Sequence, residues 1–97
     1  MNPAEIREAL REVIDPELGV NIVDLGLVYA IEIVDNEVRV TMTMTTPACP
    51  LRDYVRDLVE STLLDRVTAA QRVVVEIVQD PPWSVDMMSE TARRQLE

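Results

Sequence analysis

The sequence predicts an α+β fold in two layers, with amphipathic helices covering one face of a small, mixed three-stranded sheet. Two segments carry apolar residues at helical spacing, and three others are short and rich in Val and Ile. Ninety-seven residues are enough for one small core, so we expect residues 1–97 to form a single domain. The expected order is helix (4–14), strand (27–34), strand (37–45), helix (50–64), strand (73–78) and a C-terminal helical tail (86–96).

The first helix is predicted over residues 4–14 from a single apolar stripe. Pro16 follows closely and ends it, because the residue before a proline avoids helical geometry. Residues 15–26 contain several apolar side chains and two turn signals, so they predict an ordered connection. The stripe of the first helix consists of Ile6, Leu10, Val13 and Ile14.

A β-hairpin is predicted next, with strands 27–34 and 37–45 joined by a tight turn at Asp35-Asn36. In the second strand apolar residues alternate with Arg and Thr, so one face is expected to pack inward. Residues 73–78 supply a third strand. The inward residues of the second strand are Val38, Val40, Met42 and Met44.

The second helix is predicted over residues 50–64, with Pro50 at the first helical position. Cys49 would then be its N-cap. A short helix over 86–96 would have Asp86 as its N-cap and Arg93 and Arg94 near its C-terminus, where the helix dipole favours cations. The apolar stripe of the second helix comprises Leu51, Tyr54, Val55, Leu58, Val59, Thr62 and Leu63.

Composition excludes several classes of function. The chain has no His and no Lys, which excludes histidine-based catalysis, a histidine zinc site, a Walker-type phosphate loop and Schiff-base chemistry. A net charge of −9 disfavours nucleic acid and anionic membranes as partners, and no apolar run is long enough to span a bilayer. A single cysteine and the lack of a signal segment lead us to expect a cytoplasmic protein.

Cys49 is the first candidate functional residue. A cysteine at a helix N-cap lies where backbone N–H groups and the helix dipole favour negative charge, which lowers the thiol pKa. Pro47 and Pro50 flank it and restrict the backbone. The alternative is that Cys49 is a small buried apolar residue, which is the commonest fate of a lone cysteine.

Asp24 and Thr46 are the next candidates. Asp24 lies between apolar neighbours just before the first strand, so it is either a turn-capping carboxylate or a metal ligand and proton acceptor beside Cys49. The hydroxyls of Thr45 and Thr46 could bond the sulfur or only satisfy the strand end. Trp83, after two prolines, is either an exposed anchor for a partner or packs the tail onto the sheet.

One thiol cannot hold an iron–sulfur cluster, because such clusters commonly need four protein ligands. Two copies of the chain would supply two sulfurs. Any bound iron or cluster is therefore expected to be labile and transient, and shared in a homodimer.

Three motifs now point to one family. The first motif is residues 15–19 (DPELG) with residues 21–29 (NIVDLGLVY), and the second is residues 45–50 (TTPACP). The third is residues 80–84 (DPPWS), followed by Met88-Ser89 and Ala92-Arg93. Together they resemble the three signatures of the SufT-like family of iron–sulfur assembly domains, over about residues 4–96. The family includes PaaD, the N-terminal domain of Mrp-type ATPases and eukaryotic cytosolic iron–sulfur targeting factors. The resemblance implies a helix-strand-strand-helix-strand fold and a role in maturing iron–sulfur proteins. Its reactive cysteine, acid and threonine match Cys49, Asp24 and Thr46.

Three hypotheses follow. The first is a non-enzymatic accessory factor that passes iron or a labile cluster from assembly machinery to apoprotein targets through Cys49, with Asp24 as a second metal ligand and Thr46 shaping the site. The second is a non-catalytic adaptor that recruits targets through Trp83, the tail and the open sheet face; an auxiliary role in a phenylacetate-type oxygenase pathway is weakened because no cysteine-rich extension of the PaaD kind is present. The third is a thiol enzyme that uses Asp24 as its base.

Overall fold

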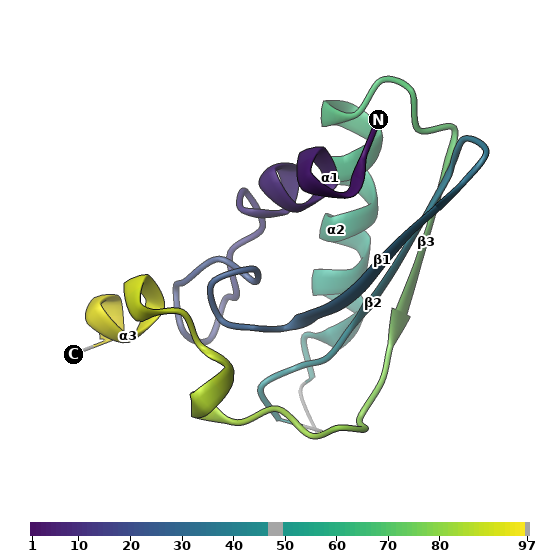
Figure 1. Ribbon diagram of the computed structural model, residues 1–97. Coiled ribbons are helices and arrows are strands. Elements are labelled where there is room, and N and C mark those ends of the chain that lie inside the picture. Colours follow the sequence, from purple (N-terminus) through teal and green to yellow (C-terminus); the bar gives the residue numbers. More distant parts are fainter. Residues whose placement is uncertain (47–49, 97) are drawn as a thin grey trace.

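The computed structural model describes residues 1–46 and 50–96, and it confirms the predicted α+β class and element order (Figure 1). Two long elements dominate, the β1–β2 hairpin and the helix α2, while residues 78–96 form an irregular segment with two short helices. The elements are α1 (Pro3–Leu10), β1 (Val28–Val34), β2 (Glu37–Met42), α2 (Arg52–Arg66), β3 (Arg72–Ile77), the 3₁₀ helix η1 (Val85–Met87) and α3 (Glu90–Leu96).

The sheet is mixed and has the order β1-β2-β3. β1 and β2 pair antiparallel through the tight turn, in which Asp35 adopts a positive φ of 56°. β2 and β3 pair in parallel, with Val38 opposite Val73. Parallel strands require a long crossover, and α2 supplies it. The start of α2 is therefore held close to the ends of β2 and β3.

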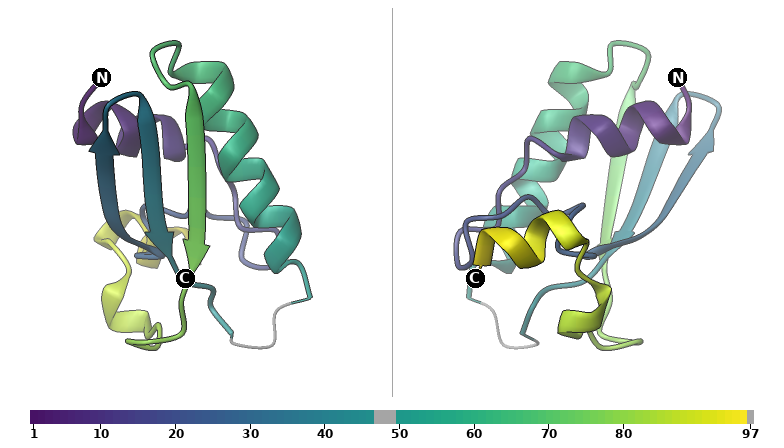
Figure 2. Two further views of the ribbon diagram at one scale, coloured as in Figure 1. Left: turned by 90° about the vertical axis from the view of Figure 1, so that its right-hand side faces the viewer. Right: turned by 60° about the vertical axis from the view of Figure 1, so that its left-hand side comes forward.

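The core lies between the sheet and the helices, which cover only one of its faces (Figure 2). The alternation predicted for the second strand is confirmed over Glu37–Met42, where Val38, Val40 and Met42 are buried. It fails beyond the end of β2, where Thr43 and Met44 are both buried. The opposite face carries charged side chains, among which Glu37 pairs with both Arg39 and Arg72. The buried side chains facing the sheet include Ile6 and Leu10 of α1 and Val55, Val59 and Leu63 of α2.

The first helix is shorter than predicted, because α1 ends at Leu10. Residues 11–13 continue in tighter turns, and the chain then pairs with itself, since the N–H of Ile22 donates to the carbonyl of Val13 at 3.0 Å. Ile14 forms an isolated bridge with Asn21 and is 46% exposed, so its assignment to the apolar stripe was wrong. These backbone bonds give residues 15–26 the order that the sequence predicted.

The second helix begins two residues later than predicted. Its first residue is Arg52 and its N-cap is Leu51, which makes no side-chain capping bond, so neither Pro50 as first helical residue nor Cys49 as N-cap is correct. The physical reason is that the first buried residue of the stripe is Val55, and packing rather than propensity stabilises most helices. Cys49 itself lies outside the described residues.

The predicted helix at 86–96 is two elements. η1 ends at Met87, and α3 begins at Glu90 after Ser89, whose Oγ accepts the backbone N–H of Ala92 at 3.2 Å. Ser89, not Asp86, therefore caps α3. Arg93 and Arg94 lie in its last turn, as predicted. Within residues 1–46 and 50–96, no helix is long and apolar enough to cross a bilayer.

Candidate functional site

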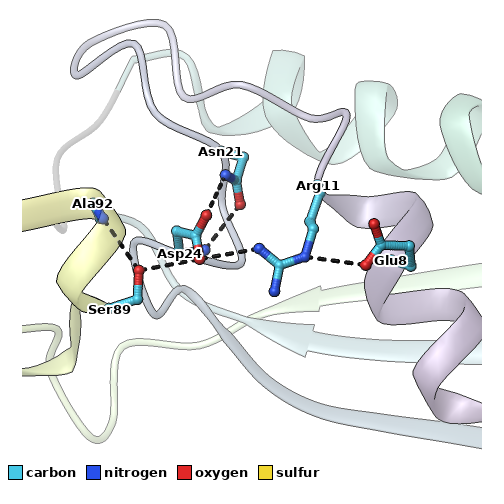
Figure 3. A network of polar contacts seen from close by, with 6 residues as sticks. All are labelled: Glu8, Arg11, Asn21, Asp24, Ser89 and Ala92. Carbon is cyan, nitrogen blue, oxygen red and sulfur yellow. Dashed lines mark hydrogen bonds and ion pairs between the residues drawn. The ribbon is translucent and has the colours of Figure 1, made fainter. Parts of the chain in front are cut away.

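Asp24 is the centre of a polar network that joins three parts of the chain (Figure 3). Its Oδ1 accepts hydrogen bonds from Nη1 of Arg11 at 3.0 Å and from Oγ of Ser89 at 3.1 Å. Its Oδ2 accepts one from Nδ2 of Asn21 at 2.7 Å. Asn21 in turn accepts the backbone N–H of Asp24 at 2.9 Å, which closes a local turn.

This network keeps the Asp24 carboxylate ionised. The hydrogen bond from Asn21 is the main cause that lowers the pKa of Asp24, and the bonds from Arg11 and Ser89 add to it against the effect of burial. The same contact with Asp24 raises the pKa of the Arg11 guanidinium. Within the described residues, both carboxylate oxygens accept hydrogen bonds from side chains, while the backbone turn is capped by Asn21 instead. The role of Asp24 as a metal ligand stays a prediction.

The C-terminal segment is fastened to residues 24–29 at several points. The N–H of Ser89 donates to the carbonyl of Asp24 at 2.7 Å, and Nε1 of Trp83 donates to the carbonyl of Leu25 at 2.6 Å. The Tyr29 hydroxyl donates to the carbonyl of Pro81 at 2.8 Å. Trp83 is thus half-buried and packs the tail, which is the second of the two roles expected for it.

Gly26 allows this close approach. Its φ is +78°, and a Cβ at this position would meet the carbonyl group of Met87, with the carbonyl carbon at 2.8 Å. A side chain here would displace the segment that carries Ser89.

Thr46 lies at a different place, in a pocket between the ends of β2 and β3 and the start of α2. The cavity has a volume of about 50 Å³, or about 380 Å³ when the open space at its mouth is counted. Thr46 and Arg52 both line it, and they lie three positions before and three positions after Cys49 in the sequence. The lining residues are Thr43, Met44, Thr45, Thr46, Arg52, Ile77, Val78, Gln79, Pro82 and Trp83.

Among the described residues, no hydrogen bond connects Asp24 with Thr46. Trp83 lies between their surroundings, because it lines the pocket with Thr46 and donates its Nε1–H to the carbonyl of Leu25, the residue after Asp24. Among residues 1–46 and 50–96 no group of three or more acidic side chains is arranged to hold a metal ion. The turn at residues 15–18 is explained by Asp15, whose Oδ1 accepts the backbone N–H groups of Glu17 and Leu18 at 2.8 and 3.0 Å.

Sequence reasoning gave no role in the Asp24 network to Arg11, Asn21 or Ser89, although Asn21 and Ser89 lie within the motifs. The spacing of Asn21 and Asp24, three residues apart in a turn, is a signal that could have identified Asn21. No local pattern links Ser89 to Asp24, because 65 residues separate them.

Comparison with known proteins agrees with this fold. A family model described as "Iron-sulfur cluster assembly protein" matches residues 3–77. The chain belongs to this family. The matched range includes Asp24, Thr46 and Cys49, whereas Trp83 and Ser89 lie beyond it.

Individual members of this iron–sulfur cluster assembly family are similar over nearly their whole length. The chain is 46% identical over 82 residues to the Fe-S protein maturation auxiliary factor SufT of Staphylococcus aureus, covering 84% of this chain and 92% of that protein. It is 44% identical over 89 residues to the factor YitW of Bacillus subtilis, covering 91% and 86%. A crystal structure of a domain of unknown function, DUF59, from Bacillus anthracis superposes with a TM-score of 0.93 at 39% identity, covering 96% and 89%.

Proposed function

We propose that this protein is an accessory factor in the maturation of iron–sulfur proteins, and that it handles iron or a labile cluster through Cys49. The observation that carries the proposal is its similarity, over more than four fifths of both chains, to SufT and YitW, which are named Fe-S protein maturation auxiliary factors. In this role residues 1–97 act as one domain, and the bound iron or cluster changes its protein ligands without any catalytic turnover. The donors and recipients are assembly machinery and apoprotein targets.

Cys49 is the ligand in this proposal because thiolate sulfur is the ligand that iron–sulfur clusters prefer, and the chain has one cysteine. A cluster therefore needs sulfur from elsewhere. We propose that a homodimer supplies the second thiolate, while other ligands remain exchangeable. Such incomplete coordination favours transfer over permanent binding.

Thr46 and Asp24 receive different roles. Thr46 is exposed at the rim of the pocket, three residues before Cys49, where its hydroxyl can donate to a bound anion or sulfur. The Asp24 carboxylate has about four acceptor sites, and hydrogen bonds from Arg11, Asn21 and Ser89 already occupy three of them. We therefore propose that Asp24 is a positioning residue, which holds the connection over residues 15–26 against the tail.

Anaerobic reconstitution with ferrous iron and sulfide tests the proposal. Wild type should retain iron after desalting and show visible absorption of a cluster, whereas Cys49→Ala should retain none above background. Thr68→Ala, an exposed residue in the turn after α2, is the control and should behave as wild type. Equal iron content in wild type and Cys49→Ala would refute the carrier mechanism.

The adaptor hypothesis keeps one supporting observation. Leu51 and Tyr54 at the start of α2 are 37% and 51% exposed, although they belong to the apolar stripe. Exposed apolar residues beside the site are suited to contact a partner. An adaptor would lose a purified apoprotein target on Tyr54→Ser and keep it on Cys49→Ala, whereas a carrier would show the reverse for iron transfer.

A further inference from the structure

The pocket beside α2 combines apolar walls with a cation. Met44, Ile77, Val78 and Trp83 contribute apolar surface, and Arg52 contributes the guanidinium. Thr43, Thr45, Thr46, Gln79 and Pro82 complete the lining. The Thr43 hydroxyl is already bonded to the carbonyl of Val78 at 2.7 Å, so it fixes the wall and is not offered to a ligand.

Arg52 differs from most arginines of this chain. In the part of the chain that the structure describes, it has no ion-pair or hydrogen-bond partner, and of the other eight only Arg7 shares this. The chain holds 18 acidic residues against nine arginines, so an arginine left without a carboxylate is unexpected. The arginines that form ion pairs are Arg11, Arg39, Arg56, Arg66, Arg72, Arg93 and Arg94.

We propose that this pocket binds an organic carboxylate that carries an apolar group, with the carboxylate on Arg52 and the apolar group against Trp83 and Ile77. A guanidinium presents paired N–H donors that match a carboxylate. Apolar walls with a few polar groups are typical of sites for small organic ligands. A phosphate suits the site less well, because a strongly hydrated dianion gains nothing from the apolar walls and is opposed by a net charge of −9.

The pocket is partly preorganised. Trp83 is held by its bond to the carbonyl of Leu25, so the indole does not have to be ordered when a ligand enters. β3 is an edge strand whose end contributes Ile77 to the lining, which leaves room for an extended chain to approach. The same carboxylate chemistry can therefore come from a free acid or from an acidic residue of a protein segment. The inference adds a ligand to the proposed function and does not depend on the chemistry of Cys49.

Trp83 is the sole tryptophan of the chain and lines the pocket, so its fluorescence reports binding directly. Two probes distinguish the sources: 4-methylpentanoate, and a six-residue peptide blocked at both ends with adjacent leucine and aspartate. We expect a saturable change in emission with at least one of them. Arg52→Gln should weaken that binding at least tenfold, and raised salt should weaken it in the wild type.

Arg7→Gln is the matched control, because Arg7 is also exposed and without an ion pair but lies on α1. It should change the affinity less than twofold. Saturation by the free acid assigns a small-molecule ligand, and saturation by the peptide alone assigns a protein segment. Either result supports the proposal when Arg52→Gln weakens the binding at least tenfold. No saturable change with either probe, or equal binding by Arg52→Gln, would overturn it. Titration of Cys49→Ser separates this result from the iron experiment, since the pocket should bind its probe whether or not iron is retained.

Discussion

Ser89 and Asp24 are joined twice, once through the backbone and once through side chains. The Ser89 N–H donates to the Asp24 carbonyl at 2.7 Å, and its Oγ donates to Oδ1 at 3.1 Å. The same Oγ accepts the N–H of Ala92 and so begins α3. One hydroxyl thus couples the start of a helix to the polar network at the other end of the sequence.

Ser89→Ala should lower the free energy of unfolding by about 1–2 kcal/mol, because it removes a helix cap and a hydrogen bond to a charged group. Thr91→Ala, in the same first turn but exposed, should change it by less than about 0.5 kcal/mol. Urea denaturation followed by circular dichroism measures both. Equal effects would mean that the Ser89 hydroxyl contributes nothing beyond helix propensity.

Asp24→Ala should destabilise the protein by about 2 kcal/mol, since three donors lose their acceptor. Glu8→Ala removes the other carboxylate that contacts Arg11, but Glu8 is 78% exposed, and exposed ion pairs contribute about 0–1 kcal/mol. The two variants compared by chemical denaturation distinguish a specific network from general charge pairing. A loss in Glu8→Ala as large as in Asp24→Ala would contradict the role given to Asp24.

The free energy of unfolding should fall as the pH is lowered below about 4. The folded-state pKa of Asp24 is lowered, chiefly by Asn21, so its contribution is complete above the unfolded value near 4 and is lost as the pH falls through the folded value. Glu37, whose pKa Arg39 lowers, acts in the same direction. Urea titrations of wild type and Asp24→Asn between pH 2.5 and 6 should give a stability difference that shrinks below pH 4. A difference independent of pH would show that Asp24 acts without its charge.

Gly26→Ala should be more harmful than Gly19→Ala. Both glycines have positive φ, of 78° and 71°, so both substitutions introduce backbone strain of about 1–2 kcal/mol. Only at Gly26 would the new Cβ meet the backbone of Met87; at Gly19 nothing lies within 4 Å. We expect Gly26→Ala to expose the tail to limited proteolysis between residues 80 and 90, with Gly19→Ala resembling wild type. Equal proteolysis would show that the tail does not depend on Gly26.

Local patterns predicted the elements of the fold well. The alternation in the second strand placed Val38 and Val40 in the core, and the stripe of α2 placed Val55, Val59 and Leu63 there. The errors occur where packing is weak. The start of α2 has no buried side chain before Val55, and the tail breaks at Ser89 because a long-range bond to Asp24 replaces a continuous helix.

The site was only partly predictable for the same reason. Thr46 and Asp24 were identified as candidates, but their surroundings come from residues far away in sequence, such as Ser89 for Asp24 and Trp83 for Thr46. Sequence reasoning did not identify Arg52 as a candidate. Its lack of a partner depends on where every carboxylate lies, which no local pattern encodes.

The attachment of the tail also bears on the order in which a nascent chain is completed. Residues 24 and 25 leave the ribosome well before residues 83 and 89, which supply their hydrogen bonds. Synthesis at about 5–20 residues per second leaves a delay of several seconds between them. During that interval the sheet can assemble while the carboxylate of Asp24 still lacks the hydrogen bond from Ser89. Because the chain is made from its N-terminus, the contacts between residues 24–25 and the C-terminal segment are among the last to form.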